Sequence, residues 1–317
     1  MLTLQIFGIF FIIVLAGIPL YFGLIATTAG IVYFKDLPYQ LDSLLLNLIA
    51  GVEPFILIAV PLFIFAGELL SRGGVGKRIV AFANVLFGWM PGGMGVVTIV
   101  SCLLFGGVSG SAIADTAAIG SLVAPTMKQK GYHPDFTAAL LSVAGTLALL
   151  MPLSIPFLVF AFISGASMRI LSMSGVIPGL ICAAALAIVC IRYGKKTGCD
   201  NGSEKASLAE IWAVTKDAGP ALLMPVIIVG GIWTGVFTPT EAAAVAVVYG
   251  LVVSLFLYKD LKPRDLPAIA LKAFQTSASV LLVIGATGVL SWLLTAEMVA
   301  TEMAEWIRTG ACPEFCV

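Results

Sequence analysis

Long apolar stretches alternate with short charged breaks along this chain. The charged residues collect at about 72–78, 128–135, 192–217 and 259–265. Outside these breaks we expect apolar segments at roughly 4–33, 43–71, 79–108, 111–127, 136–168, 170–191, 220–237, 240–258 and 266–294. A helix needs about 20 mostly apolar residues to cross the hydrocarbon core of a bilayer. The pattern therefore predicts an all-α, polytopic membrane protein.

The first apolar segment, residues 4–33, contains no charged residue. It is longer than the apolar core of a secretory signal peptide, and it has no basic leading region and no small-residue cleavage site followed by a soluble domain. We therefore expect it to form the first membrane helix of the mature protein.

One long polar stretch divides the apolar segments into two groups. We expect residues 1–196 to form a first membrane half, residues 197–219 a polar linker, and residues 220–309 the start of a second half. The last eight residues, GACPEFCV at 310–317, fit no membrane pattern. They are expected to be an aberrant tail on a second half that is incomplete.

Composition agrees with a membrane location and excludes several functions. The chain is 60% hydrophobic and 11% charged, with a net charge of zero. Nucleic acids and anionic surfaces bind clustered basic residues, so we expect membrane lipid around the apolar segments and no nucleic-acid partner. Six scattered cysteines and the sole His133 give no metal-ligand pattern. We expect no cofactor, and the absence of a G-x-x-x-x-G-K-[ST] motif gives no support for direct ATP coupling.

The apolar segment at residues 105–120 contains a break rich in small polar residues. Three glycines and two serines fall within six positions, followed by Asp115. Glycine allows the backbone to unwind, and unwound backbone at membrane depth is tolerated where it lines a cavity. Freed backbone carbonyls and the hydroxyls of Ser109 and Ser111 would then be available to a hard cation such as sodium, which prefers oxygen ligands. The alternative is that these small residues only allow close helix packing.

A second break lies at residues 151–157, MPLSIPF, where Pro152 and Pro156 are about one helical turn apart. A helix cannot continue through this sequence undisturbed. The pattern is typical of the tip of a re-entrant hairpin, where a half-helix N-terminus presents free N–H groups to an anion. An ordinary proline kink is the alternative.

A third polar group opens the segment at residues 240–258. Thr238 precedes Pro239, and Thr240 and Glu241 follow. A threonine before proline, with an acid in the first turn, is a helix N-terminal signature. Capping explains these residues without a ligand, and a role at a transport site is the alternative.

Two other classes of membrane protein share some of these features. Residues 107–110 spell the G-x-S-G of rhomboid-type intramembrane serine proteases, which need a histidine base within reach of the serine. Only His133 is available, in a polar loop, so we do not expect an enzyme. A passive channel usually has a selectivity filter or a ring of charge, whereas broken helices in a chain with two halves favour alternating access.

Four motifs resemble the large permease subunits of tripartite ATP-independent periplasmic (TRAP) transporters, also called DctM-like. They are PLFIFAGELLSRGG at 61–74, GGVSGSAIADTAAIGSLVAPTMKQKGY at 106–132, SVAGTLALLMPLSIPFLVFA at 142–161, and GVFTPTEAAAVAVVYGL at 235–251. The resemblance extends to about residue 308.

The resemblance implies a subunit of the bacterial inner membrane that imports carboxylates with sodium. Its implied partners are a small TRAP membrane subunit and a periplasmic substrate-binding protein. It also implies an elevator-type fold of inverted repeats, each with a re-entrant hairpin, and this chain ends before the second hairpin tip.

The resemblance also assigns roles to residues. Ser109, Gly110 and Ser111 would help bind sodium, with Asp115 shaping the site behind them. Pro152, Leu153 and Ser154 would form the first hairpin tip, although this family usually has a second proline at the position of Leu153.

Overall fold

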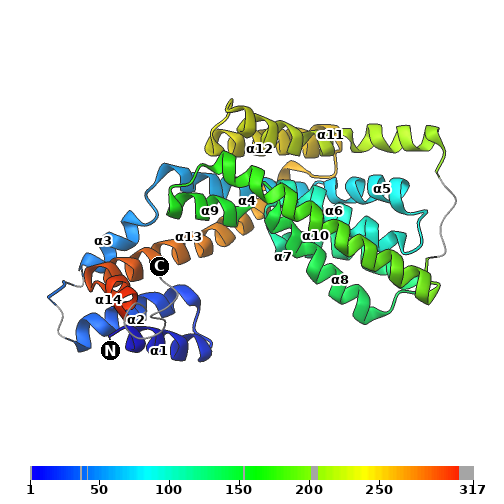
Figure 1. Cartoon of the computed structure of the whole chain (residues 1–317). Coiled ribbons are helices and arrows are strands. Elements are labelled where there is room, and N and C mark those ends of the chain that lie inside the picture. The colour runs from blue at the N-terminus through cyan, green and yellow to red at the C-terminus, as the bar shows by residue number, and fades with distance from the viewer. Residues whose placement is uncertain (1, 36–37, 41, 153, 201–205, 307–317) are drawn as a thin grey trace. The chain divides into compact units, whose positions relative to one another are not determined.

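The computed structural model describes residues 2–35, 38–40, 42–152, 154–200 and 206–306, which form helices joined by turns, with no strand among them (Figure 1). Five helical stretches in this part of the chain are long and apolar enough to cross a membrane. They are Phe55–Arg72, Met168–Thr197, Leu208–Thr234, Pro239–Leu257 and Pro263–Ala296. The prediction of an all-α, polytopic membrane protein is confirmed.

The chain divides into two compact units, one of residues 1–55 with 276–317 and one of residues 56–275. The predicted membrane halves on either side of residues 197–219 stay a prediction, as do the inverted repeats and the elevator motion. The predicted tail at 310–317 lies outside the described residues.

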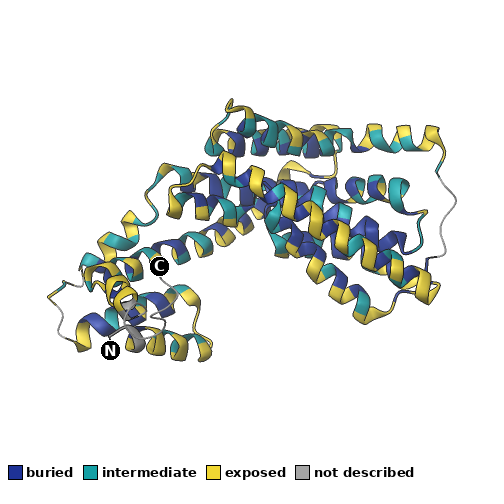
Figure 2. Ribbon diagram, in the orientation of Figure 1, coloured by how far each residue is buried: buried dark blue, intermediate teal, exposed yellow. Residues whose placement is uncertain are grey.

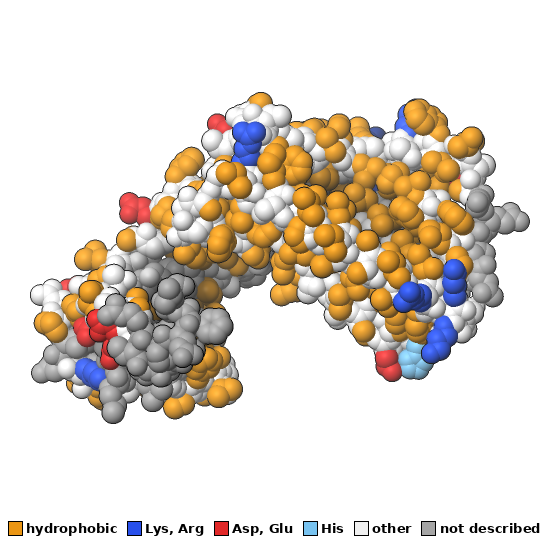
Figure 3. Space-filling view, in the orientation of Figure 1, with side chains coloured by type: hydrophobic (Ala, Val, Ile, Leu, Met, Phe, Trp, Pro, Cys, Tyr) orange, Lys and Arg blue, Asp and Glu red, His pale blue; other side chains and the backbone are white. Residues whose placement is uncertain are grey.

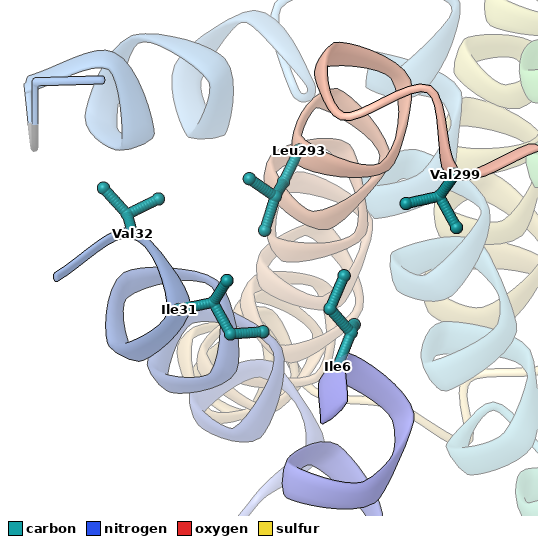
Figure 4. Close-up of a cluster of buried hydrophobic side chains, with 5 residues drawn as sticks. All are labelled: Ile6, Ile31, Val32, Leu293 and Val299. Carbon is teal, nitrogen blue, oxygen red and sulfur yellow. The ribbon is translucent and has the colours of Figure 1, made fainter. Parts of the chain in front are cut away.

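The smaller unit is a cluster of short helices around one end of a long helix. It contains α1 (Leu2–Leu15), α2 (Leu20–Phe34), α3 (Asp42–Ala50), the last part of α13 (Leu266–Ala296) and α14 (Val299–Trp306). Five buried apolar side chains from four of these helices form its core (Figure 4): Ile6, Ile31, Val32, Leu293 and Val299. Just beyond α3, Gly51 lies against Gly285 of α13, so the two backbones approach closely where neither residue has a side chain.

Helices α1 and α2 take the place of the single membrane helix expected over residues 4–33. Between them Gly17 has a φ of +81°, in the region that favours glycine, and Pro19 precedes the first residue of α2. Gly23 contacts Ile13, so α2 runs back along α1. With 14 and 15 residues, each helix is shorter than the roughly 20 residues of a perpendicular span. The prediction of one helix was wrong because a glycine and a proline turn the chain without any charged residue.

The larger unit is built from nine helices and the beginning of α13. The nine are α4 (Ala59–Arg72), α5 (Val75–Phe87), α6 (Gly93–Ser109), α7 (Ala112–Gln129), α8 (Pro134–Leu147), α9 (Ile155–Ser164), α10 (Met168–Thr197), α11 (Leu208–Thr234) and α12 (Pro239–Val252). Four short helical turns join or extend them: η1 (Phe55–Ile58), η2 (Ala148–Leu150), the π-helical η3 (Val253–Leu257) and η4 (Pro263–Asp265).

The predicted apolar segments differ in how well they match these helices. Four of them, 111–127, 170–191, 240–258 and 266–294, agree within several residues with α7, α10, α12 with η3, and α13. The segments 43–71, 79–108 and 136–168 are each broken into two helices. The breaks contain Pro54, Pro91 and Pro152, and proline removes a backbone donor and crowds the preceding turn.

Helix α11 begins earlier than the sequence pattern indicates. Residues 208–219 belong to the helix, although they were predicted to be part of a polar linker. Ser207 is the N-cap, and its hydroxyl accepts a hydrogen bond from the backbone N–H of Glu210 at 3.2 Å. The cap fixes the start of α11, and apolarity begins only further along the helix.

The outer surface of the larger unit is apolar over most of its length. Exposed residues mark one side of α10 in Figure 2, and they include Ile177, Leu180, Ile181 and Ile188. Figure 3 shows apolar side chains across the visible face of this unit, with basic side chains gathered at the end where α8 begins and α10 ends. An apolar exterior with few charged side chains fits a protein embedded in lipid.

The charged end of this unit is organised around Asp200, which is only 8% exposed. Its carboxylate accepts hydrogen bonds from the backbone N–H of Met94 at 2.8 Å and from the Tyr132 hydroxyl at 3.3 Å, and it pairs with Lys130 at 2.8 Å. Burial, together with the neighbouring charge of Asp200, raises the pKa of Tyr132, so its hydroxyl stays protonated and donates. Asp200 therefore joins the first turn of α6 to the loop after α7.

We expect Asp200→Ala to lower the thermal stability of the purified protein. The change removes two bonds to a charged acceptor and leaves Lys130 unpaired, and such bonds contribute about 1.5–3 kcal/mol each. Asp135→Ala is the control, because Asp135 is 90% exposed beside His133 and a surface pair contributes little. Thermal unfolding in detergent measures both variants, and equal melting temperatures would contradict the role given to Asp200.

Candidate functional site

Helices α6 and α7 form a tight antiparallel hairpin in the larger unit. Near its open end the Thr98 hydroxyl lies 3.8 Å from the sulfur of Met127. At its closed end the Ser109 hydroxyl donates a hydrogen bond to Asp115. As the residue number rises along α6 it falls along α7 by nearly the same amount, from Thr98 with Met127 to Ser109 with Asp115. The two helices are therefore antiparallel. The chain reverses between Ser109 and Ala112.

Gly110 and Ser111 make this reversal possible because they satisfy the backbone groups at both helix ends. Gly110 has a φ of +63° and donates its N–H to the carbonyl of Gly106, which closes α6. Ser111 is extended, and its hydroxyl accepts from the N–H of Ala114 at 3.4 Å, which opens α7. The hairpin tip therefore leaves few backbone groups without a partner.

The second predicted break, at Pro152, bends the chain but does not reverse it. Helices α8 and α9 differ in direction by 40°. α10 runs antiparallel along both, since Tyr193 stacks on Phe136 of α8 while Gly175 lies against Phe157 of α9. The structure therefore places the chain reversal at Gly110, and not at the predicted hairpin tip of Pro152 and Ser154. Leu153 lies outside the described residues.

The two breaks lie beside each other. The backbone N–H of Ile155, the first residue of α9, donates to the carbonyl of Gly110 at 3.4 Å. Gly106 of α6 lies against Ala148, at the end of α8, and against the Asp115 carboxylate. The structure thus brings Ser109, Gly110, Ser111 and Asp115 next to the segment that holds Pro152 and Ser154, and all six lie at helix ends or in the breaks between helices.

Two oxygen atoms at this junction, one of Asp115 and one of Ser154, are buried without a partner among the described residues. Asp115 and Ser154 are both fully buried. One carboxylate oxygen of Asp115 accepts from Ser109, whereas the other has no hydrogen-bond partner, and neither has the Ser154 hydroxyl. Buried polar atoms without partners are uncommon because they lose the free energy of hydration without recovering it. Two such atoms at one junction make it the candidate site.

The donor set suits a hard cation rather than a transition metal. Carboxylate, hydroxyl and backbone carbonyl oxygens are the ligands that hard cations prefer. No group of three His, Cys, Asp or Glu side chains that could hold a metal occurs in the described part of the chain. The junction can therefore supply oxygen ligands to an ion such as sodium.

Helix α4 supports the hairpin tip from the side through Gly67. A Cβ atom on Gly67 would lie 3.1 Å from the Cα and 3.2 Å from the carbonyl oxygen of Ser109. Gly145 of α8 is more confined still, because a Cβ there would overlap the hydroxyl oxygen of Thr116 and lie 3.2 Å from the carbonyl oxygen of Ala112. Sequence reasoning missed Gly67, Gly106 and Gly145 as site residues, because glycine in an apolar segment shows its neighbours only after folding.

Thr238 and Glu241 cap the N-terminus of α12, and Thr240 lies in the first turn of that helix. The carboxylate of Glu241 accepts from the backbone N–H and the hydroxyl of Thr238, both at 2.8 Å, and the Thr238 hydroxyl accepts from the N–H of Glu241 at 3.3 Å. This reciprocal arrangement is a capping box. The polar atoms of Thr238 and Glu241 are thus used by the helix.

The capping box also lies away from the hairpin tip. α12 runs parallel to α4, since Gly250 packs on Leu70 and Gly73 lies against Ser254. Gly67 of α4 therefore lies beside about residue 247 of α12. Pro239, at the start of α12, is eight residues away from that point, which is roughly 12 Å along the α12 axis at 1.5 Å per residue.

The arrangement around Ser109 does not support a serine protease. Ser109 donates to Asp115, while the sole histidine, His133, precedes α8 at the open end of the hairpin. The 18 residues of α7 separate the two ends, which is roughly 27 Å of helix. No histidine base is within reach of Ser109.

The sequence matches the DctM component of the tripartite ATP-independent periplasmic transporter over residues 7–315. It is 36% identical to the C4-dicarboxylate TRAP transporter large permease protein DctM of Rhodobacter capsulatus, over 97% of this chain and 72% of that protein. The chain belongs to the DctM family. Another DctM relative is the sialic acid TRAP transporter large permease protein SiaM of Vibrio cholerae, 34% identical over 93% of this chain and 68% of that protein. A third is the ectoine TRAP transporter large permease protein TeaC of Halomonas elongata, 35% identical over 88% of this chain and 66% of that protein.

We expect Gly106→Ala to damage the DctM hairpin and Gly107→Ala to be tolerated. A Cβ on Gly106 would lie 2.5 Å from the Cβ of Ala148 and 2.9 Å from the Asp115 carboxylate, whereas one on Gly107 would meet only Pro225, at 3.7 Å. Overpacking of this kind costs about 1–3 kcal/mol. The measurement is the yield and melting temperature of the two purified variants. Equal behaviour would show that the tip is less tightly packed than described.

Proposed function

We propose that this chain is the large membrane subunit of a sodium-coupled secondary transporter that imports organic anions, most of them carboxylates. The observation that carries the proposal is the pair of buried, unpartnered oxygen atoms, one of Asp115 and one of Ser154, where the α6–α7 hairpin meets the bend between α8 and α9. Membership in a transporter family supports an ion site here, because a coupling ion must bind inside the protein and be released again.

Sodium is proposed to bind at the hairpin tip. Ser109 and Ser111 would supply hydroxyl oxygens and Gly110 its backbone carbonyl, with the carboxylate of Asp115 balancing the charge of the ion behind Ser109. The Ser154 hydroxyl faces no other partner and would add a ligand from the α8–α9 bend. In a low-dielectric surrounding, the attraction between a cation and a buried carboxylate is strong.

The substrate is proposed to bind next to this ion through its anionic group. The first turn of α9 follows the bend at Pro152, and a helix N-terminus favours negative charge. The relatives are named for C4-dicarboxylate, sialic acid and ectoine, which supports small organic acids as the class. The site residues proposed here bind the ion and leave the choice among such acids to other contacts.

The proposed partners are a small TRAP membrane subunit and a periplasmic substrate-binding protein, in a bacterial inner membrane. The word tripartite in the family description supports this, as does a relative, the isethionate TRAP transporter permease protein DctMQ of Oleidesulfovibrio alaskensis, 35% identical over 95% of this chain and 47% of that protein. Membrane lipid would cover the apolar exterior.

The test is uptake into liposomes that contain the complete transporter. Radiolabelled succinate and sialic acid are added with their binding protein, under an inward sodium gradient or an equal potassium gradient. We expect uptake of at least one anion that requires both sodium and the binding protein. Uptake that is equal with potassium, or equal without the binding protein, would overturn the corresponding part of the proposal.

Ser109→Ala should raise the sodium concentration that gives half-maximal uptake about tenfold, since loss of one oxygen ligand worth about 1.4 kcal/mol changes affinity by that factor. Ser121→Ala is the matched control on the same hairpin. Ser121 is exposed, and its hydroxyl donates only to the Ala118 carbonyl within α7. Unchanged sodium dependence in Ser109→Ala would remove Ser109 from the ion site.

Asp115→Asn should reduce transport more than it reduces the amount of folded protein in the membrane. The substitution keeps the shape and the acceptor for Ser109 but removes the charge that is costly to bury. Size-exclusion profiles of the tagged variant report folding, and uptake reports transport. If both fall by the same factor, Asp115 has a structural role only.

A further inference from the structure

Two adjacent residues of α4 reach different neighbours. Gly67 lies against the backbone of Ser109 at the hairpin tip. Glu68 points toward α13, where its carboxylate lies 2.8 Å from the ammonium of Lys272, and it also lies 3.9 Å from Arg72 of its own helix. Successive residues on a helix are about 100° apart, so α4 touches the proposed ion site with one side and α13 with another.

Glu68 is a charged residue in a helix that could span the membrane. The apolar stretch Phe55–Arg72 contains it, and its side chain is only 12% exposed. A carboxylate in such a place is costly without a partner. Lys272, whose side chain is 54% exposed, is the nearer of the two basic partners of Glu68.

The ion pair acts together with an apolar contact that fixes the same two helices. Leu69, the next residue of α4, belongs to a buried cluster with Ile269 of α13. Ile269 and Lys272 are three residues apart, so they lie on one side of α13. A charged contact and an apolar contact side by side determine both the rotation of α4 and its position along its axis.

We propose that Glu68 is a positioning residue for the ion site. Its pair with Lys272 holds α4 in the rotation at which Gly67, the residue without a side chain, faces Ser109. The contact at Gly67 leaves little tolerance, because even a Cβ there would lie 3.1 Å from the Ser109 backbone. A small rotation of α4 would bring Ala66 or Glu68 toward the tip and displace Ser109. The inference rests on the proposed function of the tip as a sodium site.

The test measures sodium binding to the purified protein by thermal stabilisation, with potassium at the same ionic strength as the reference. We expect Glu68→Gln and Lys272→Gln each to raise the half-saturating sodium concentration three- to tenfold. Lys272→Arg keeps the charge and should stay within twofold of the unchanged protein. The control is Arg264→Gln, which breaks a pair with Asp265 at the start of α13, where the two side chains are 77% and 45% exposed.

A second set of variants separates positioning from general loss of stability. Gly67→Ala should also raise the half-saturating sodium concentration, and Glu68→Gln added to it should have less than its separate effect, since both act through one contact. Gly230→Ala, with nothing within 4 Å of the added Cβ, is the glycine control. Independent, additive effects of Gly67→Ala and Glu68→Gln would overturn the inference.

The outcomes distinguish this inference from the function on which it rests. If sodium stabilises the unchanged protein and the Glu68 and Lys272 variants respond to the same sodium concentration, the positioning role is wrong and the proposed function stands. If sodium stabilises the unchanged protein no more than potassium does, the proposed ion site is wrong and the role of Glu68 falls with it.

Discussion

Asp115 is fully buried, and one of its carboxylate oxygens has no hydrogen-bond partner in the described part of the chain. A buried carboxylate is among the costliest groups to place in an apolar interior, so the surrounding structure has to be specific. Ser109 donates to it, Gly106 leaves room for it, and Ala148 closes the space from α8. The Asp115 carboxylate can stay buried only because helices pack tightly around the hairpin tip.

Helix ends inside a membrane protein raise a second difficulty, because each end leaves backbone groups without partners. The larger unit solves it by placing two breaks side by side. Gly110 closes α6, Ser111 opens α7, and the N–H of Ile155 at the start of α9 uses the carbonyl of Gly110. The groups that remain free are oxygens, and this is why the junction suits a cation.

Much of the fold could be predicted from the sequence, and the reason is the apolar pattern. It located α7, α10 and α13 within several residues, and it singled out Ser109 to Asp115 as a break. The apolar pattern failed at Gly17, where the chain turns without a charged residue. It also failed at Ser207, which caps α11 before the apolar residues begin, although Glu210 three residues later was a signal for that cap. At Pro152 it left two possibilities, a hairpin tip and a kink, because the same residues can reverse or bend a helix, and helices α8 and α9 differ in direction by 40° there. The glycines that confine the site could not be found, since their role depends on neighbours distant in sequence.

The reversal at Gly110 bears on the order in which the site is assembled. Ser109 and Asp115 are six residues apart, and the hairpin that holds them is contained in residues 93–129. Contacts that are close in sequence form quickly because little loop entropy is lost. The half of the site on the hairpin can therefore fold while the ribosome is still adding later residues. The part of the site that includes Ser154 forms only after α8 and α9 have been added, and the contact between Glu68 of α4 and Lys272 of α13 forms later still.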